Sequence, residues 1–268
     1  VVQGNGVTIV AAEDKRINQD ILIPYNLDLN AEEGQVVEVE ITTQPSIREK
    51  PMGKIIKILG SYADSGIEIE IALRKHHLPY EFSKEAMNQA NQYGSEIDPN
   101  EIAGRIDLRQ LSLITIDGET ARDFDDAVYA EPSKDGRRLI VAIADVSAYV
   151  NKGSNLDEEA LERGNSVYFP RRVIPMLPES LSNGLCSLNP NVDRLCMVCD
   201  MNISDLGKVT SYTFYPSVMQ SKARLTYTIA DEILNKQNVK LKEKYNHICG
   251  NLENLHSIFK LLFSQRKK

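Results

Sequence analysis

The feature that most constrains this chain is a run of carboxylates between two apolar segments. Five of the ten residues from position 117 to position 126 are Asp or Glu, and strand-like apolar segments flank them at 113–116 and 127–130. A run placed in this way is not the solvated face of one regular element. Carboxylates that converge at strand ends repel one another by about a kcal/mol or more per close pair at intermediate dielectric, unless a cation lies between them. The run therefore predicts an acidic loop at a sheet edge.

Four aspartates of this run are the candidate site residues. Asp117 lies at the end of the first flanking segment, and Asp123, Asp125 and Asp126 lead into the second. Oxygen-only ligands select hard cations, Mg²⁺ or alternatively Mn²⁺. A Mg²⁺ ion with positions open to phosphate oxygens suits phosphodiester hydrolysis, because it lowers the pKa of an attacking water. The alternatives are a structural cation, although the spacing does not fit an EF-hand loop, and an exposed turn without a ligand.

The N-terminal 75 or so residues predict a small β domain. Alternation of apolar and polar residues, interrupted by turn residues, divides this region into five short strands. The predicted strands are residues 7–10, 21–23, 36–41, 54–59 and 67–71. Five short strands suit a Greek-key barrel of the OB or cold-shock type, although any five-stranded β domain fits the pattern equally well.

The remainder of the chain mixes strands with helices. The predicted strands are 113–116, 127–130, 138–144, 194–203 and 208–220, and the predicted helices are 156–163, 228–236 and 242–268. A polar stretch over 79–104, with a short helix at 84–92, separates the two regions. The predicted fold class is therefore α+β, with one domain at 1–78, a linker at 79–104 and a second domain at 105–268.

Composition and cysteine usage exclude several protein classes. With 42% hydrophobic and 26% charged residues, the chain is neither disordered nor fibrous. No apolar run approaches the roughly 18 residues of a membrane helix, so no membrane association is expected. Four cysteines in 268 residues do not form a disulfide scaffold, which favours a cytoplasmic protein. Cys196 and Cys199 have the spacing of half a zinc site, but strand alternation separates their side chains and favours unligated thiols.

Longer stretches of the sequence resemble the RNB family of exoribonucleases, which includes RNase II and RNase R. The central stretch is Thr115–Ala127, around the acidic loop. Further stretches are 141–146, 167–170, 174–178, 181–190, 192–199 and 223–227. The resemblance covers nearly the whole chain and is closer to the RNase R branch. It implies an N-terminal five-stranded OB-fold (cold-shock) barrel that binds RNA, followed by the first part of a mixed α+β RNB catalytic domain.

The resemblance also implies an activity. The family hydrolyses RNA processively from single-stranded 3′ ends to nucleoside 5′-monophosphates, with Mg²⁺. Asp117, Asp123, Asp125 and Asp126 match its catalytic aspartates, with Asp117 and Asp126 as the principal metal ligands and Asp125 as the acid whose loss is most damaging. We expect a monomer that takes part in RNA degradation in the cytoplasm, with other RNA-decay proteins as partners.

Four further residues are candidate RNA contacts. Tyr168 matches the family tyrosine that packs against the terminal nucleotide. Arg122 lies inside the acidic loop, where a phosphate contact and a charge-balancing salt bridge fit equally well. Arg171 and Arg172 follow Tyr168; they either hold backbone phosphates or are surface arginines before a turn.

The family's catalytic domain continues beyond the motifs found here. Its later arginine-rich motif and its C-terminal OB domain are not present in this sequence, so we expect an incomplete enzyme that is weakly active or inactive alone. Two alternatives remain open. One is a non-catalytic RNA-binding module built on the barrel, and the other is a metal-dependent endoribonuclease, which needs no RNA end.

Overall fold

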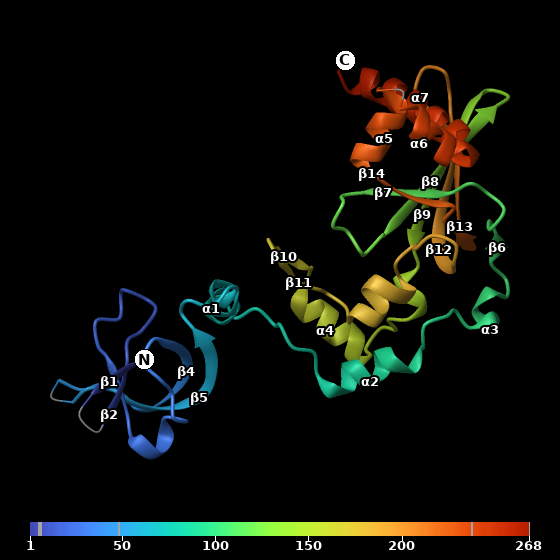
Figure 1. The fold of residues 1–268 in the computed structure, drawn as a ribbon. Helices are drawn as coiled ribbons and strands as arrows, with labels where there is room; N and C mark the ends of the chain where they lie inside the picture. The colour runs from blue at the N-terminus through green and yellow to red at the C-terminus, as the bar shows by residue number, and fades with distance from the viewer. Residues whose placement is uncertain (5–6, 48, 237, 268) are drawn as a thin grey trace. The chain divides into compact units, whose positions relative to one another are not determined.

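A computed structural model describes residues 1–4, 7–47, 49–236 and 238–267 of the chain. The chain divides into two compact units. The first unit comprises Val1–Tyr80 together with Phe169–Arg172, and the second comprises Glu81–Tyr168 and Val173–Lys268. Each unit has its own sheet, and helices accompany both, which confirms the predicted α+β class (Figure 1).

The first unit is built on a five-stranded sheet with the order β1-β2-β3-β5-β4. The strands are β1 (Val2–Gly4), β2 (Val7–Val10), β3 (Ile21–Ile23), β4 (Gln35–Thr43) and β5 (Met52–Ser61). All neighbours are antiparallel except β3 and β5, which pair in parallel. Val10, Ile23, Ala31 and Ile55 form the buried core of this unit. The number of strands and the positions of four of them agree with the prediction.

The fifth predicted strand, at 67–71, is wrong. This segment is the first part of α1 (Ile67–Lys75), and the remaining strand of the sheet is β1. Alternating Ile and Glu residues are typical of a strand, but helical spacing places Glu70 one turn before Arg74, and the two side chains form an ion pair of 2.6 Å. Acidic residues in the first turn and basic residues in the last turn also match the helix dipole.

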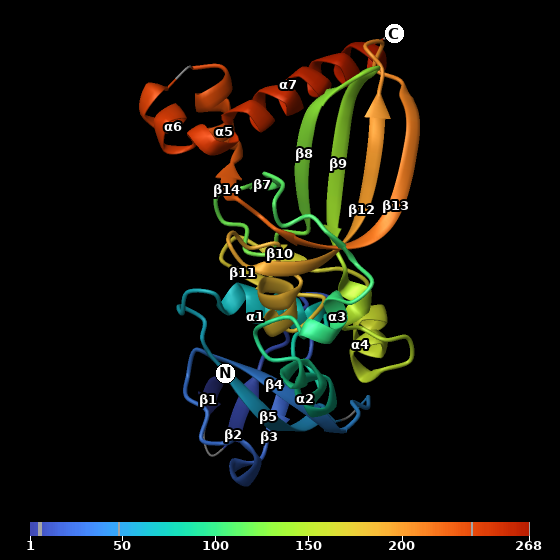
Figure 2. The ribbon, with the colours of Figure 1, turned by 90° about the vertical axis from the view of Figure 1, so that its right-hand side faces the viewer.

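The second unit contains a seven-stranded sheet with the order β14-β7-β8-β9-β12-β13-β6. In Figure 2 the long strands β8, β9, β12 and β13 stand side by side. The strands are β6 (Ile106–Asp107), β7 (Ile114–Asp117), β8 (Asp126–Ser133), β9 (Gly136–Ala144), β12 (Asp193–Ile203), β13 (Val209–Gln220) and β14 (Ala223–Thr226). A separate two-stranded sheet joins β10 (Val167–Phe169) to β11 (Arg172–Ile174). The strands predicted for this region are confirmed.

The second unit also contains helices, of which α5 and α7 contact strands of the larger sheet. They are α2 (Lys84–Gln92), α3 (Pro99–Ile102), α4 (Asn155–Arg163), α5 (Tyr227–Leu234), α6 (Val239–Lys244) and α7 (Asn246–Arg266), with a π-helical segment at Ser180–Leu185. The predicted helix at 84–92 is confirmed. The predicted helix at 242–268 is divided, because Tyr245 (φ −106°, ψ 21°) leaves the helical conformation between α6 and α7, and Lys268 lies outside the described residues.

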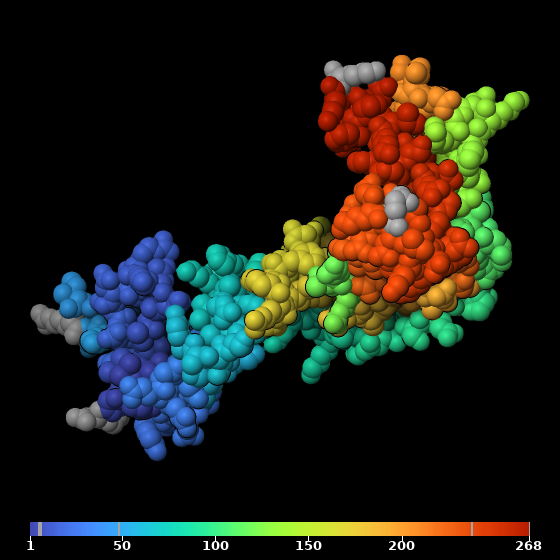
Figure 3. All heavy atoms as spheres, turned by 45° about the horizontal axis from the view of Figure 1, so that its top comes forward, coloured from blue at the N-terminus to red at the C-terminus, as the bar shows by residue number. Residues whose placement is uncertain are grey.

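Buried apolar side chains of the described residues form three groups that include strands of this sheet, and one of them joins Ile114 of β7 and Leu225 of β14 to α5 and α7. The largest group includes Leu113, Ile140, Leu195 and Val198 and extends to α2 and α4. On α7, Ile258 packs with Ala130 of β8 and Ile203 of β12. Figure 3 shows the red end of α7 beside the orange turn between β12 and β13, where Gln265 donates a hydrogen bond to the carbonyl oxygen of Leu206. Among the helices of the described ranges, none has both the length and the apolar character needed to cross a bilayer.

Candidate active site at the acidic loop

The acidic loop, residues 117–126, joins two neighbouring strands of the larger sheet. β7 ends at Asp117 and β8 begins at Asp126, which pairs with Ile143 of β9. β14 runs parallel to β7, and this register places Thr226 opposite Asp117. Parallel strands end at the same edge of a sheet, so the end of β14 lies beside the start of the loop.

A buried aromatic ring anchors the middle of the loop. Phe124 is 3% exposed, whereas Asp123 on one side and Asp125 on the other reach solvent. The carbonyl oxygen of Asp125 also accepts a hydrogen bond of 2.8 Å from the amide of Ala144. The loop therefore presents its carboxylates outward because its apolar residue is held inside.

The carboxylates lie close enough to influence one another's charge. Partial burial, followed by the negative charges of Asp123, Asp126 and Asp117, raises the pKa of Asp125. Partial burial and the charge of Asp117 likewise raise the pKa of Asp126. Like charges that raise each other's pKa are stabilised by a cation placed among them. The loop therefore has the electrostatic character of a cation site.

Tyr168 contacts this group from β10. Its hydroxyl donates a hydrogen bond of 2.7 Å to Oδ2 of Asp123, and its side chain is 65% exposed. This hydrogen bond, together with burial and the charges of Asp123 and Asp125, raises the pKa of Tyr168 to about 12. The phenol therefore stays protonated at neutral pH and remains a donor, with its ring open to solvent.

The carboxylates of the acidic loop fit a magnesium ion whose remaining ligands come from water and substrate. Within the described ranges, no three His, Cys, Asp or Glu side chains are gathered as a ready-made ion site. Mg²⁺ is commonly bound through one or two carboxylates and completed by water and phosphate oxygens, so a closed protein cage is not required. The amide of Gly118 donates a hydrogen bond of 2.6 Å to Oδ1 of Asp117, which orients that carboxylate. Asp117 and Asp126 are suited to hold such an ion.

The predicted arginines are distributed between the two units. Arg122 is exposed within the loop of the second unit. Arg171 and Arg172 belong to the first unit, where Arg171 donates a hydrogen bond to the hydroxyl of Ser65 and Arg172 pairs with Glu70 at 2.5 Å. The structure thus assigns Tyr168, Arg122 and the four aspartates to one unit and the other two arginines to the other unit.

The sequence analysis did not identify Arg224 as a residue that supports the loop. Its Nη2 donates hydrogen bonds to the carbonyl oxygens of Ala121 (2.9 Å) and Glu119 (3.3 Å), and its guanidinium lies 4.6 Å from the centre of the Phe124 ring. The stretch 223–227 resembles a family motif, but only the parallel pairing of β14 with β7 brings it to the loop.

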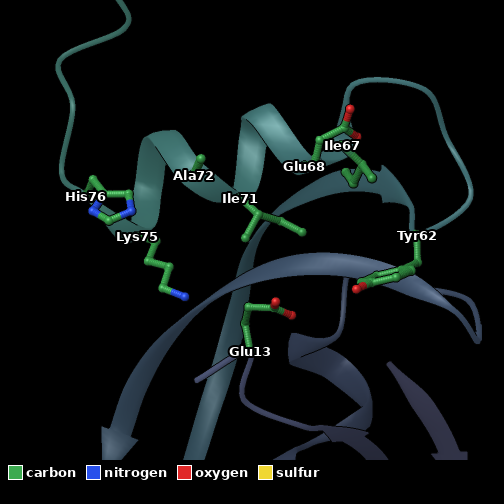
Figure 4. Close-up of a pocket in the computed structure, with 8 residues that line it drawn as sticks. All are labelled: Glu13, Tyr62, Ile67, Glu68, Ile71, Ala72, Lys75 and His76. Atoms are coloured by element: carbon green, nitrogen blue, oxygen red, sulfur yellow. The ribbon is translucent and has the colours of Figure 1, made fainter. Parts of the chain in front are cut away.

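A hollow lies in the first unit, and none of the predicted site residues lines it. It has a volume of about 380 Å³ and is bordered by α1 (Figure 4). Its lining residues are Glu13, Tyr62, Ile67, Glu68, Ile71, Ala72, Lys75 and His76. Acidic and basic side chains are mixed in this hollow, whereas acidic side chains predominate in the acidic loop. The loop therefore remains the candidate active site.

Comparison with known proteins gives matches over both units. The RNB domain family matches residues 105–268, and the cold shock domain family matches residues 9–83. The chain is 52% identical over 262 residues to Ribonuclease R of Vibrio parahaemolyticus and 51% identical over 264 residues to Ribonuclease R of Escherichia coli. These alignments cover 97% and 98% of this chain but 31% and 32% of those proteins. The chain therefore spans about a third of the length of these relatives.

A solved structure has the same fold over nearly the whole of this chain. RNase R of Mycoplasma genitalium, in complex with double-stranded RNA, superposes with a TM-score of 0.86 at 28% identity. The superposition covers 97% of this chain and 47% of that chain.

Proposed function

The chain belongs to the RNB family of ribonucleases, and we propose that its acidic loop is the hydrolytic site of a 3′→5′ exoribonuclease. The proposed reaction removes nucleoside 5′-monophosphates processively from the 3′ end of single-stranded RNA. The observation that carries the proposal is the placement of four aspartates on one loop, with raised pKa values at Asp125 and Asp126 and an exposed tyrosine hydrogen-bonded to Asp123.

Each acidic residue has a proposed role. Asp117 and Asp126 hold Mg²⁺, or Mn²⁺ in its place; when bound, the ion would lower the pKa of the attacking water and balance charge on the scissile phosphate. The carboxylate of Asp125 accepts a proton from that water, since a base with a raised pKa is better matched to neutral pH. Asp123 accepts the hydroxyl hydrogen bond of Tyr168 and so fixes the orientation of its ring.

RNA binding is proposed for both units. The exposed ring of Tyr168 is a platform on which the terminal base stacks, and stacking of this kind contributes roughly 1–3 kcal/mol per base. Arg122 is exposed within the loop and is a proposed phosphate contact, as are Arg171 and Arg172 of the first unit. The cold shock domain match over residues 9–83 supports single-stranded RNA as the ligand of the first unit.

The test uses the protein that carries this sequence and two RNAs of identical sequence, one linear with a 5′ label and one circular. With Mg²⁺, the linear RNA should be converted to mononucleotides while the circular RNA stays intact. Asp125→Asn should abolish hydrolysis and leave RNA binding within about twofold of the unmodified protein. Cleavage of the circle would support an endoribonuclease instead, and RNA binding without hydrolysis would support a non-catalytic module.

A further inference from the structure

A buried hydroxyl lies directly behind the acidic loop. Ser187 is 0% exposed, and its Oγ–H donates a hydrogen bond of 2.9 Å to the carbonyl oxygen of Arg122. The same Oγ accepts a hydrogen bond of 3.0 Å from the amide of Phe124. One hydroxyl thus joins two loop residues that are more than 60 positions away from it in sequence.

The residue after Ser187 adds a third bond. The amide of Leu188 donates a hydrogen bond of 2.8 Å to the carbonyl oxygen of Phe124. Both backbone polar groups of Phe124 are therefore paired with the segment 187–188. Breaking such a bond in a buried position is unfavourable, because the remaining polar group finds no water to replace its partner. Phe124 lies between Asp123 and Asp125, so the backbone position of both carboxylates depends on these bonds.

Arg194 of β12 in turn holds Ser187. Its side chain is 7% exposed, and its Nε–H donates a hydrogen bond of 2.9 Å to the carbonyl oxygen of Ser187. A second hydrogen bond, from Nη1 to the carbonyl oxygen of Asp193, fixes the guanidinium in place. Bonds therefore run from the central sheet through Arg194 and Ser187 to the acidic loop. Because Ser187 is fully enclosed, it cannot touch RNA, and its effect passes through the loop.

We propose that Ser187, held by Arg194, is a positioning residue that sets the placement of the Asp123 and Asp125 carboxylates. The catalytic part of this inference rests on the proposed function. The part that concerns the loop backbone does not.

The test compares Ser187→Ala with Ser217→Ala in the full 268-residue chain. Ser217 is a matched control, since it is also 0% exposed and, within the described residues, its hydroxyl has no hydrogen-bond partner. Hydrogen–deuterium exchange at the Phe124 amide, followed by NMR, is the primary readout. Ser187→Ala should speed this exchange by roughly tenfold or more, because its hydrogen-bond acceptor is gone. Ser217→Ala should leave it unchanged.

Two further readouts concern the carboxylates. Mn²⁺ affinity, measured by electron paramagnetic resonance, should weaken several-fold in Ser187→Ala and stay unchanged in Ser217→Ala. In RNA hydrolysis by the protein that carries this sequence, Ser187→Ala should lower kcat while KM for RNA stays the same. Ser187→Thr, which keeps the hydroxyl, should restore the Mn²⁺ affinity and the kcat of the unmodified protein.

The outcomes separate the inference from the function it deepens. Unchanged Phe124 exchange in Ser187→Ala would overturn the inference and leave the proposed function standing. If the unmodified protein neither binds Mn²⁺ nor cuts RNA, the proposed function fails, while Phe124 exchange still decides whether Ser187 holds the loop. Should Ser187→Ala not fold, Ser187→Cys takes its place, because a thiol is a weak hydrogen-bond partner; equal exchange in that variant and the unmodified chain would also overturn the inference.

Discussion

The hydroxyl of Tyr168 donates a hydrogen bond of 2.7 Å to the carboxylate of Asp123, which lies 45 residues earlier in the chain. This contact links the strand that carries the exposed ring to the loop that carries the four aspartates. It also makes the ionisation of the phenol a direct probe of the loop's charge.

Asp123→Asn should lower the pKa of Tyr168 from about 12 toward the ordinary value of about 10. The amide still accepts the hydrogen bond, but it no longer opposes formation of the phenolate with a negative charge. NMR titration with ring-labelled tyrosine measures the shift, and Tyr168→Phe identifies the signal. A Tyr168 pKa that stays near 12 in Asp123→Asn would show that the contact does not exist in solution.

Neutralising Asp125 should leave the fold intact or stabilise it. A carboxyl group whose pKa is raised on folding binds its proton more tightly in the folded state, so it destabilises the fold once pH rises through that pKa. Asp125→Asn should therefore unfold at the same or a higher temperature than the unmodified chain at pH 7 in EDTA, and any difference should disappear at low pH. Thermal unfolding followed by circular dichroism measures this, and a lower Tm in the variant would contradict it.

Magnesium should stabilise the unmodified chain more than Asp126→Asn, because a ligand that binds only the folded state raises Tm. The comparison is the rise in Tm between EDTA and 10 mM Mg²⁺, with Asp135→Asn, outside the loop, as the control. Equal rises in all three proteins would argue against Asp126 as a metal ligand.

Arg224→Lys should loosen the acidic loop although it keeps the charge. An ammonium cannot reproduce both the planar contact with Phe124 and the hydrogen bonds to the carbonyl oxygens of Ala121 and Glu119. We expect faster hydrogen exchange across residues 118–125 and a several-fold lower rate of RNA hydrolysis. Arg137→Lys, which changes an ion pair with Asp205, is the matched control and should affect neither.

Asp200 should contribute to stability in a pH-dependent way. Two hydrogen bonds from Arg138, at 2.9 Å and 2.6 Å, and a third from the hydroxyl of Tyr215 hold the pKa of Asp200 below its ordinary value. A carboxyl group with a lowered pKa stabilises the fold above its unfolded pKa, and this stabilisation is lost as pH falls through the folded pKa. Asp200→Asn should lower the free energy of unfolding by about 1–2 kcal/mol at pH 7, measured by urea unfolding, and the difference should shrink as pH falls below the ordinary carboxyl pKa of 3.8.

Several parts of the fold could be predicted from local patterns. The acidic run between two apolar segments located Asp117 at the end of a strand and Asp126 at the start of the next, because strand ends follow from alternation and turn composition. The same reasoning was wrong at Ile67–Ile71. There the period-two pattern predicted a strand, while the ion pair between Glu70 and Arg74 depends on residues beyond the segment. Similarly, the sequence predicted one helix over 242–268 and gave no sign of the break at Tyr245.

The sequence by itself determined the family to which the chain belongs, and it singled out the four aspartates and Tyr168 as the residues proposed to carry the chemistry. Only the tertiary structure decided what holds them in place. Ser187 reaches the loop from the segment before β12 and is itself held by Arg194 of β12, and Arg224 reaches the loop from β14. Residue type and spacing report local preferences, whereas the contacts of Ser187 and Arg224 with the loop join residues that are about 60 to more than 100 positions apart. They exist because strand pairing in the larger sheet brings those segments to one edge, where buried backbone groups must find partners.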